Sequence, residues 1–217
     1  MKKLFIPAEI GDFSLPKNIP EGLEGRVGVV TTAQHLRHMK DVELFLKTKG
    51  LTPIRAGQII GCNISNALKV KDSVDCFLYV GTGRFHPIEI SLNAGKPVYA
   101  LNPIDGKIEA IPKEELKRWE RKRKAQVALA VKAETFGILV STKEKQYNMI
   151  EALALKKKLE GSGRKAFLFI GEELNPDNVL PFKVDAWINT ACPRIADDFF
   201  KKPVLNPGEV SYILDQE

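Results

Sequence analysis

Cysteines and long apolar runs are scarce in this sequence of 217 residues. It contains three cysteines, Cys62, Cys76 and Cys192, and their odd number and wide spacing argue against a disulfide framework. Apolar runs such as 125–131 are far shorter than the roughly 20 residues that cross a bilayer. Residues 1–7 contain only a short apolar stretch before a proline, which is unlike a signal peptide. We therefore expect a cytoplasmic protein without a membrane segment.

The sequence also lacks the aromatic and glycine patterns of RNA-binding modules, although it is basic. It has 33 Lys and Arg residues against 27 Asp and Glu residues, which gives a formal net charge of +6. The densest basic run, 117–124, falls on a predicted helix. Charge runs usually form a solvated face, so we expect an exposed, ion-paired helix rather than a phosphate-binding patch, and no direct contact with nucleic acid.

What the sequence does contain is an internal repeat. Segments of the first half return in the second half at offsets of 109, 110 and 106 residues. The matched pairs are 27–32 with 136–141, 74–80 with 184–190, and 96–98 with 202–204. Because the offset is nearly constant, the repeat predicts two copies of one structural unit, with a site at their junction.

Strand and helix patterns alternate in both halves, which predicts an α/β fold of two small domains with parallel sheets. Expected strands are 26–31, 52–54, 76–80, 97–100, 136–140, 165–170, 186–189 and 204–205. Expected helices are 33–48, 65–68, 88–94, the charged linker 111–132, and 147–159. The first repeat is predicted to occupy 24–112, and the linker with the second repeat 113–217.

Ligands of α/β proteins bind at the carboxyl ends of parallel strands, and the expected loops there are chemically rich. These loops are 31–35, 81–86, 141–146 and 189–194. Each holds hydroxyl, amide, imidazole or thiol groups. Hydroxyl-bearing loops before helices are also ordinary N-caps, so both interpretations stay open for Thr32 and Thr142.

The cysteines fall into two kinds. Cys76 lies in an apolar strand, where a small buried side chain is expected. Cys62 follows Gly61, and Cys192 precedes Pro193, so both belong to open loops. Spacing alone leaves a metal or cluster role open, because no CxxC pair is present and two thiolates are fewer than the four usual for an iron–sulfur cluster.

At these loops the sequence resembles the radical enzyme family of diphthamide synthesis, the 2-(3-amino-3-carboxypropyl)histidine synthases. The similarity extends over essentially the whole chain. The motifs that carry it are TTAQH (31–35), GQIIGCN (57–63), GTGRFHP (81–87), GILVSTKEKQ (137–146) and VDAWINTACPRIADDF (184–199).

The resemblance implies a pseudo-threefold architecture of three α/β domains, in which each domain gives one cysteine to a [4Fe-4S] cluster that binds S-adenosylmethionine. It makes Cys62 and Cys192 cluster ligands. It also implies cleavage of the cofactor to methylthioadenosine and transfer of its 3-amino-3-carboxypropyl group to a histidine of a translation elongation factor. These expectations come from the family, not from the spacing of the cysteines.

The same resemblance suggests further site residues. Arg194 could bind the cofactor carboxylate as a bidentate fork, and Ser141, Thr142 and Gln146 could hydrogen-bond the amino-acid or ribose end. Arg194, Gln146 and His86 are the expected catalytic residues. The expected cofactor contacts are Gln34, Thr82, Ser141, Thr142, Gln146 and Arg194. For the loop residues of this set, a role as helix caps stays open.

The sequence departs from the family pattern in two places. The family carries a whole domain with the first cluster cysteine before this point, whereas residues 1–23 resemble only its closing strand and a linker, and Lys145 replaces a usual glycine. We therefore expect a homo- or hetero-oligomer with a chain that supplies the first domain. Two other functions stay open: a noncatalytic partner for docking and electron delivery, and a cluster enzyme of the quinolinate synthase type.

Overall fold

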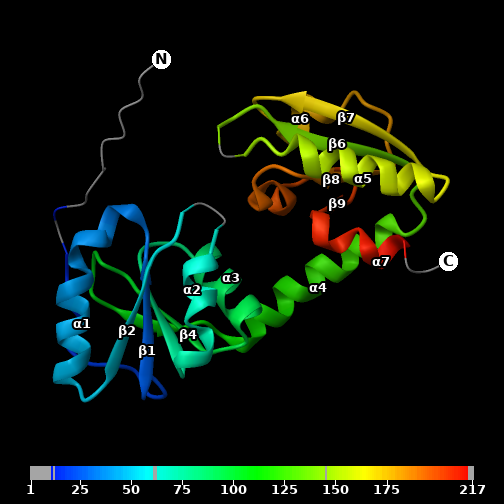
Figure 1. The fold of residues 1–217 in the computed structure, drawn as a ribbon. Helices are drawn as coiled ribbons and strands as arrows, with labels where there is room; N and C mark the ends of the chain where they lie inside the picture. Colours follow the sequence, from blue (N-terminus) through cyan, green and yellow to red (C-terminus); the bar gives the residue numbers. More distant parts are fainter. Residues whose placement is uncertain (1–10, 12, 61–62, 145, 215–217) are drawn as a thin grey trace. The chain divides into compact units, whose positions relative to one another are not determined.

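The computed structural model describes residues 11, 13–60, 63–144 and 146–214. The expected closing strand before residue 10 lies outside these residues. The chain divides into two compact units, Met1–Lys117 and Arg118–Glu217 (Figure 1). Within the described ranges, no helix has the length and apolar character that a membrane span requires.

The first unit is built on a sheet with the strand order β2-β1-β3-β4-β5. Neighbouring strands are parallel except β5, which is antiparallel to β4. The strands are β1 (Arg26–Thr31), β2 (Thr52–Gln58), β3 (Cys76–Val80), β4 (Val98–Leu101) and β5 (Ile108–Ala110). The helices are η1 (Ala33–His38), α1 (Met39–Thr48), α2 (Ser65–Lys69), η2 (Lys71–Ser73) and α3 (Phe85–Ala94), where η marks a 3-10 helix.

The second unit contains a fully parallel sheet with the order β7-β6-β8-β9. Its strands are β6 (Thr135–Ser141), β7 (Lys165–Gly171), β8 (Ala186–Asn189) and β9 (Val204–Leu205). The helices are α4 (Lys113–Ala130), which begins in the first unit, α5 (Met149–Gly161), α6 (Pro176–Val179), η3 (Pro193–Asp197), η4 (Pro207–Glu209) and α7 (Ser211–Leu214). This order repeats β2-β1-β3-β4, so the predicted α/β repeat is confirmed.

In each unit, an aspartate that precedes one strand binds the first residue of the neighbouring strand. Asp75, just before β3, accepts a hydrogen bond of 2.8 Å from the backbone N–H of Arg26. Asp185, just before β8, accepts one of 2.9 Å from the N–H of Thr135. The aspartate of the repeated Val-Asp pair is therefore explained by a hydrogen bond to the first residue of the neighbouring strand, Arg26 of β1 or Thr135 of β6.

A glycine faces an aromatic residue across the same strand pair in each unit. Gly28 pairs with Phe77, and Gly137 pairs with Trp187. A Cβ atom on Gly28 would lie 2.6 Å from the Phe77 ring, and one on Gly137 would overlap the Trp187 ring. The glycines leave room for the rings, which explains why both copies of the repeat contain glycine at this place.

Cys76 belongs to the hydrophobic core on the α1 face of the first sheet, as the sequence predicts. Its side chain is buried, and its thiol donates a weak hydrogen bond of 3.6 Å to the carbonyl of Glu24. Burial raises the pKa of the Cys76 thiol. Cys76 is thus a structural residue.

Two elements of the first unit are longer than predicted. Strand β2 continues from Ile54 to Gln58, because a register shift lets Gly57 pair with Val30. Gly57 has a φ of 96°, which glycine adopts without strain. Helix α3 starts at Phe85 instead of residue 88, since Pro87 lies in the first turn, where a backbone N–H has no partner within the helix.

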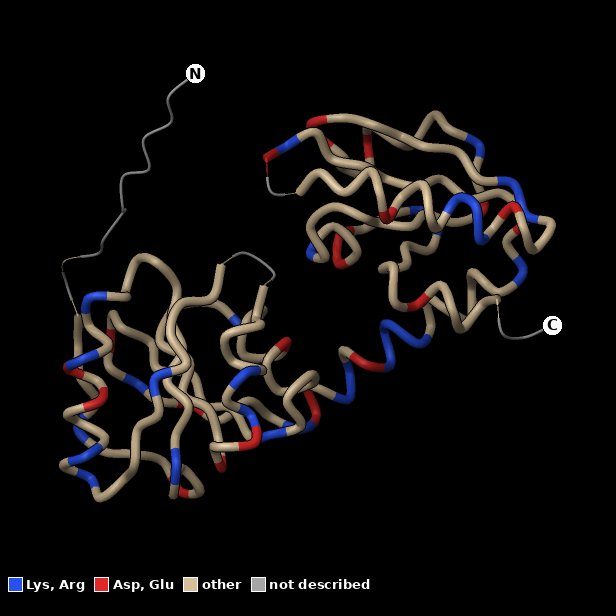
Figure 2. The backbone as a smooth tube through the Cα atoms, viewed as in Figure 1, with Lys and Arg blue, Asp and Glu red and all other residues tan. Residues whose placement is uncertain are grey.

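Other expectations were wrong. The sheet of the first unit is not fully parallel, because the short strand β5 adds antiparallel to its edge. The expected helix 33–48 is divided into η1 and α1. In helix α4, whose Lys and Arg residues are blue in Figure 2, Arg123 departs from the expected exposed run, because it is only 5% exposed. Glu209 lies beside it and neutralises the buried charge.

Candidate functional site

A cavity of about 430 Å³ opens in the second unit where β6, β7 and β8 end. Its described lining includes groups from all three strand-end loops. These residues are Ser141, Lys143, Gln146, Glu172, Glu173, Leu174, Asn175, Cys192, Ile195 and Asp198. The structure therefore brings together Ser141, Gln146 and Cys192, which the sequence identified in two separate motifs.

Cys192 stands between β8 and η3. Its backbone is extended, with φ −73° and ψ 123°, and it forms the N-cap of η3. Pro193 follows at the first helical position, where its fixed φ favours the start of a helix. The Cys192 side chain is half-buried and lines the cavity. This placement suits a thiolate that binds a group in the cavity.

Asn189 was not predicted as a site residue, but its side chain hydrogen-bonds the loop that carries Cys192. Its side chain is buried, its Nδ2 donates 2.8 Å to the carbonyl of Cys192, and its Oδ1 accepts 3.0 Å from the N–H of Ala191. A buried amide needs such partners because it loses its bonds to water. The signal for it was an asparagine within an otherwise apolar strand.

A tight turn after β6 contributes Ser141 and Gln146 to the lining. The Oγ of the buried Ser141 accepts a hydrogen bond of 3.1 Å from the N–H of Lys143. The N–H of Gln146 donates 3.0 Å to the carbonyl of Lys143. Lys145 lies outside the described residues.

Arg194 and Thr142 are exposed and are absent from the described lining of this cavity. Arg194 lies on η3, two residues after Cys192. The backbone N–H of Thr142 donates 2.9 Å to the carbonyl of Gly171, which ties the β6 loop to the end of β7. Their predicted roles at the cofactor stay predictions.

Carboxylates outnumber cations around the cavity. Lys143 is the cationic residue of the described lining, against Glu172, Glu173 and Asp198. Beside them, burial raises the pKa of the Asp197 carboxyl, an effect that the nearby Lys122 and Arg123 oppose. The cavity is therefore suited to a ligand that carries positive charge.

The predicted residues of the first unit lie at the ends of β1 and β3. Gln34 is exposed on η1. His86 is half-buried in α3, and its Nδ1 lies 3.3 Å from the hydroxyl of Tyr79. Burial raises the pKa of Tyr79 to about 12, so its hydroxyl stays protonated. His86 was expected in a loop, and its place on a helix beside a buried tyrosine is a correction.

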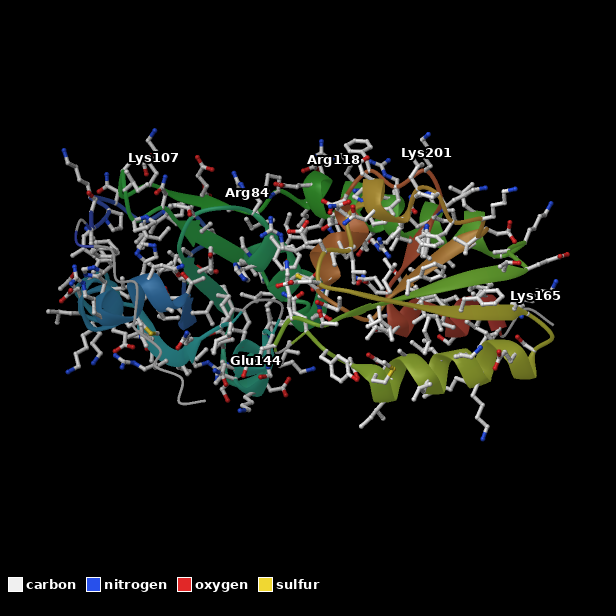
Figure 3. The ribbon with its side chains drawn as sticks, turned by 90° about the horizontal axis from the view of Figure 1, so that it is seen from above. Arg84, Lys107, Arg118, Glu144, Lys165 and Lys201 are labelled. Atoms are coloured by element: carbon white, nitrogen blue, oxygen red, sulfur yellow. The ribbon has the colours of Figure 1, made fainter. Side chains whose placement is uncertain are left out.

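Thr82 lines a smaller cavity of about 160 Å³ in the first unit. Arg84 and Lys107 also line it, the first at the start of α3 and the second just before β5 (Figure 3). Arg84 binds Glu109 with an N–O distance of 2.7 Å. Both cations of this cavity, Arg84 and Lys107, lie beside carboxylates.

The cysteine loops do not occupy equivalent places in the repeat. Cys192 follows β8, and an offset of 110 residues puts Thr82, after β3, at the corresponding position. Cys62 instead belongs to the segment after β2 and lies outside the described residues. In the described part of the chain, no group of His, Cys, Asp and Glu residues could hold a metal ion by itself. The soft, cavity-lining thiol of Cys192 fits an iron–sulfur cluster as one ligand of a larger set.

Parallel strands whose terminal loops surround a cavity with thiol, hydroxyl and amide groups define a ligand-binding α/β protein. The chain belongs to the diphthamide synthesis family: the family model described as "Putative diphthamide synthesis protein" matches residues 6–217.

Two archaeal relatives are both named 2-(3-amino-3-carboxypropyl)histidine synthase. The protein from Pyrococcus horikoshii is 35% identical over 215 residues, which cover 93% of this chain and 61% of the relative. The protein from Methanocaldococcus jannaschii is 31% identical over 194 residues, which cover 87% and 52%. The chain thus spans about half to three-fifths of the length of these relatives.

The fold agrees with solved structures. The crystal structure of Dph2 from Pyrococcus horikoshii with a 4Fe-4S cluster matches with a TM-score of 0.79 and 34% identity, over 88% of this chain and 58% of that one. Another crystal structure of the same protein matches with a TM-score of 0.80 and 33% identity over the same shares. The family and the fold class predicted from the sequence are confirmed.

Proposed function

We propose that this chain takes part in diphthamide biosynthesis as a 3-amino-3-carboxypropyl transferase. The donor is S-adenosylmethionine, and the acceptor is a histidine of a translation elongation factor. The observation that supports this most is that Ser141, Gln146 and Cys192, from two family motifs about 50 residues apart, line one cavity.

A [4Fe-4S] cluster is the cofactor of this proposal, with Cys62 and Cys192 as ligands. The third cysteine of the sequence, Cys76, is buried in a core and unsuited to this role. A further ligand therefore comes from outside these 217 residues, on the same polypeptide or on another chain. When bound, the cluster supplies the electron for cleavage of a carbon–sulfur bond of S-adenosylmethionine.

The residues of the cavity suit the charges of this donor. S-adenosylmethionine carries a sulfonium and an ammonium group, which the carboxylates of Glu172, Glu173 and Asp198 can balance. Ser141 and Gln146 offer hydrogen bonds to its amino-acid or ribose end.

The proposal also includes predicted site residues that are not part of the described lining of this cavity. Arg194 binds the carboxylate of the donor, and its fork fixes the orientation of the reacting bond. Thr142, Gln34 and Thr82 contact the cofactor, and His86 takes part in catalysis. The elongation factor docks at the strand ends that carry these loops.

Anaerobic reconstitution with iron, sulfide and a chain that supplies the further cluster ligand, followed by measurement of methylthioadenosine, tests the proposal. We expect bound iron and sulfide, and product formation that depends on S-adenosylmethionine and a reductant. Ser141→Ala should raise the KM for S-adenosylmethionine about tenfold, because a ligand contact worth about 1.4 kcal/mol corresponds to a factor of ten. Ser211→Ala, which removes an exposed hydroxyl on α7, is the matched control and should change nothing.

Failure would take a recognisable form. If the chain bound no iron after reconstitution with every candidate source of the further ligand, and formed no methylthioadenosine, the transferase function would be wrong. A noncatalytic role as a docking or electron-delivery subunit would then be favoured.

A further inference from the structure

Helix α4 reaches the Cys192 loop through a buried arginine. Arg123 donates from Nε to Glu209 Oε1 at 2.8 Å, and from Nη2 to the other oxygen of the same carboxylate. Its Nη1 donates 3.2 Å to the carbonyl of Ala196, and Nη2 also donates 3.0 Å to the carbonyl of Val204. One guanidinium thus connects α4, η3, β9 and η4.

The preceding residue of the helix makes a parallel contact. Lys122 Nζ donates 2.9 Å to the carbonyl of Asp197 and lies 3.9 Å from its carboxylate. Two consecutive residues of α4 therefore bind two consecutive carbonyls at the end of η3. All of these groups belong to the second unit.

The contacts continue to the start of the same loop. Glu209 Oε2 accepts 2.7 Å from the N–H of Asn206, and Asn206 Oδ1 lies 3.4 Å from Nδ2 of Asn189. Asn189 donates to the carbonyl of Cys192. The segment 192–197 is therefore held at its first residue by Asn189 and at its last two by α4, and the two attachments belong to one hydrogen-bonded ring.

We infer that Lys122 and Arg123 are positioning residues that fix the segment 192–197, and through it the thiol of Cys192 and the guanidinium of Arg194. This inference rests on the proposed function for the roles of those two groups. A 3-10 helix as short as η3 has poor internal hydrogen bonds, so its geometry depends on outside contacts. Lys122 and Arg123 of α4 supply these contacts, which explains why Arg123 is buried although it belongs to a basic run.

The geometry requires arginine at position 123. A guanidinium can donate to Glu209, Ala196 and Val204 at the same time because its donors are spread over a planar fork. The single ammonium of lysine cannot reach the same acceptors together. Arg123→Lys keeps the charge beside Glu209 and should lose the contact with η3.

Hydrogen exchange in the cluster-free protein tests the positioning directly. We expect the amides of 194–198 to exchange about tenfold faster in Lys122→Met and Arg123→Lys, because local opening becomes easier. Lys122 is partly exposed, so its variant should fold even if the Arg123 variant does not. Lys124→Met and Arg121→Lys are the matched controls, since both residues are exposed on the same helix.

A second measurement separates positioning from a purely structural role. In the reconstituted holoprotein, Lys122→Met should broaden the electron paramagnetic resonance signal of the reduced cluster. It should also raise the KM for S-adenosylmethionine while the thermal midpoint stays close to that of wild type.

The outcomes are distinguishable. Unchanged exchange in both variants would overturn the inference, and so would faster exchange with an unaltered cluster signal and KM. If wild type formed no methylthioadenosine while exchange responded as expected, the proposed function would fail and the attachment of the segment to α4 would stand.

Discussion

The side-chain amide of Asn189 spans the loop that carries Cys192, with one hydrogen bond to the Cys192 carbonyl and one from the Ala191 N–H. Both partners belong to the loop, and Asn189 itself ends strand β8. These hydrogen bonds connect Cys192, three residues after the strand ends, to the rigid sheet. Precise placement of a ligand on a loop needs such support, because loops alone hold geometry poorly.

Asn189→Asp should loosen this loop. The substitution replaces the Nδ2 donor with an oxygen that faces the Cys192 carbonyl, and it buries a carboxyl group. We expect a loss of about 1–3 kcal/mol in the free energy of unfolding, measured by urea titration. The reconstituted protein should also lose iron faster than wild type when a chelator is added.

Asn18→Asp is the matched control, because Asn18 is exposed and lies outside the helices and strands. It should leave both the unfolding midpoint and the iron content unchanged. Equal effects of the two substitutions would contradict the role given to Asn189.

Gly137→Ala should destabilise the second unit. A Cβ atom at this position would overlap the Trp187 ring in the adjacent strand, which forces a shift within a packed core. Overpacking of this kind costs about 1–3 kcal/mol. Gly161→Ala provides the comparison, because a Cβ there meets nothing within 4 Å and alanine favours the helix. Thermal unfolding should show a lower midpoint only for Gly137→Ala.

The repeat was the most informative feature of the sequence because it reflects contacts within each sheet. The Val-Asp pair and the central glycine recur since each unit needs an aspartate before its third strand and space beside an aromatic ring. Apolar runs predicted the buried strands β3 and β8 to the residue. Such local patterns can be seen without any knowledge of the fold.

Interactions between distant segments could not be predicted in this way. Arg123 resembles its exposed neighbours in the sequence, and only the fold brings Glu209, 86 residues later, beside it. The cavity likewise gathers Glu172 and Cys192 from loops of different strands. The sequence did predict Ser141, Gln146 and Cys192 as site residues. It gave no sign that Thr142 and Arg194 lie outside the described lining.

Asp75 should contribute to stability in a way that depends on pH. The hydrogen bonds with Arg26 lower the pKa of the Asp75 carboxyl from 3.8 to about 2. A carboxyl whose pKa is lower in the folded state contributes stability above pH 3.8, and this contribution is lost as the pH falls toward 2. Wild type should therefore exceed Asp75→Asn in urea midpoint at neutral pH, and the difference should vanish near pH 2.

Asp72→Asn is the control for this titration, because Asp72 is exposed in η2 of the same unit. Its midpoint should follow that of wild type at every pH. A gap between wild type and Asp75→Asn that stayed constant down to the lowest pH would show that the carboxylate charge is irrelevant.

Arg194→Ala should damage catalysis more than folding. The side chain is exposed on η3, so its removal should change the free energy of unfolding by less than about 0.5 kcal/mol. If it orients the donor carboxylate, methylthioadenosine formation should fall about a hundredfold. Arg121→Ala removes an exposed guanidinium from α4 and should keep full activity. Equal activity of the two variants would remove Arg194 from the proposed site.

The two described cysteines should respond oppositely to substitution. Cys76→Ala removes a small group from the core around α1, which should cost about 1 kcal/mol of unfolding free energy and leave iron binding intact. Cys192→Ala should leave stability nearly unchanged, because its side chain is only half-buried, and should abolish retention of the cluster. Iron and sulfide analysis beside urea unfolding separates the two effects. Normal iron content in Cys192→Ala would show that the thiol lining the cavity does not bind the cluster, and with it the proposed cofactor site would be lost.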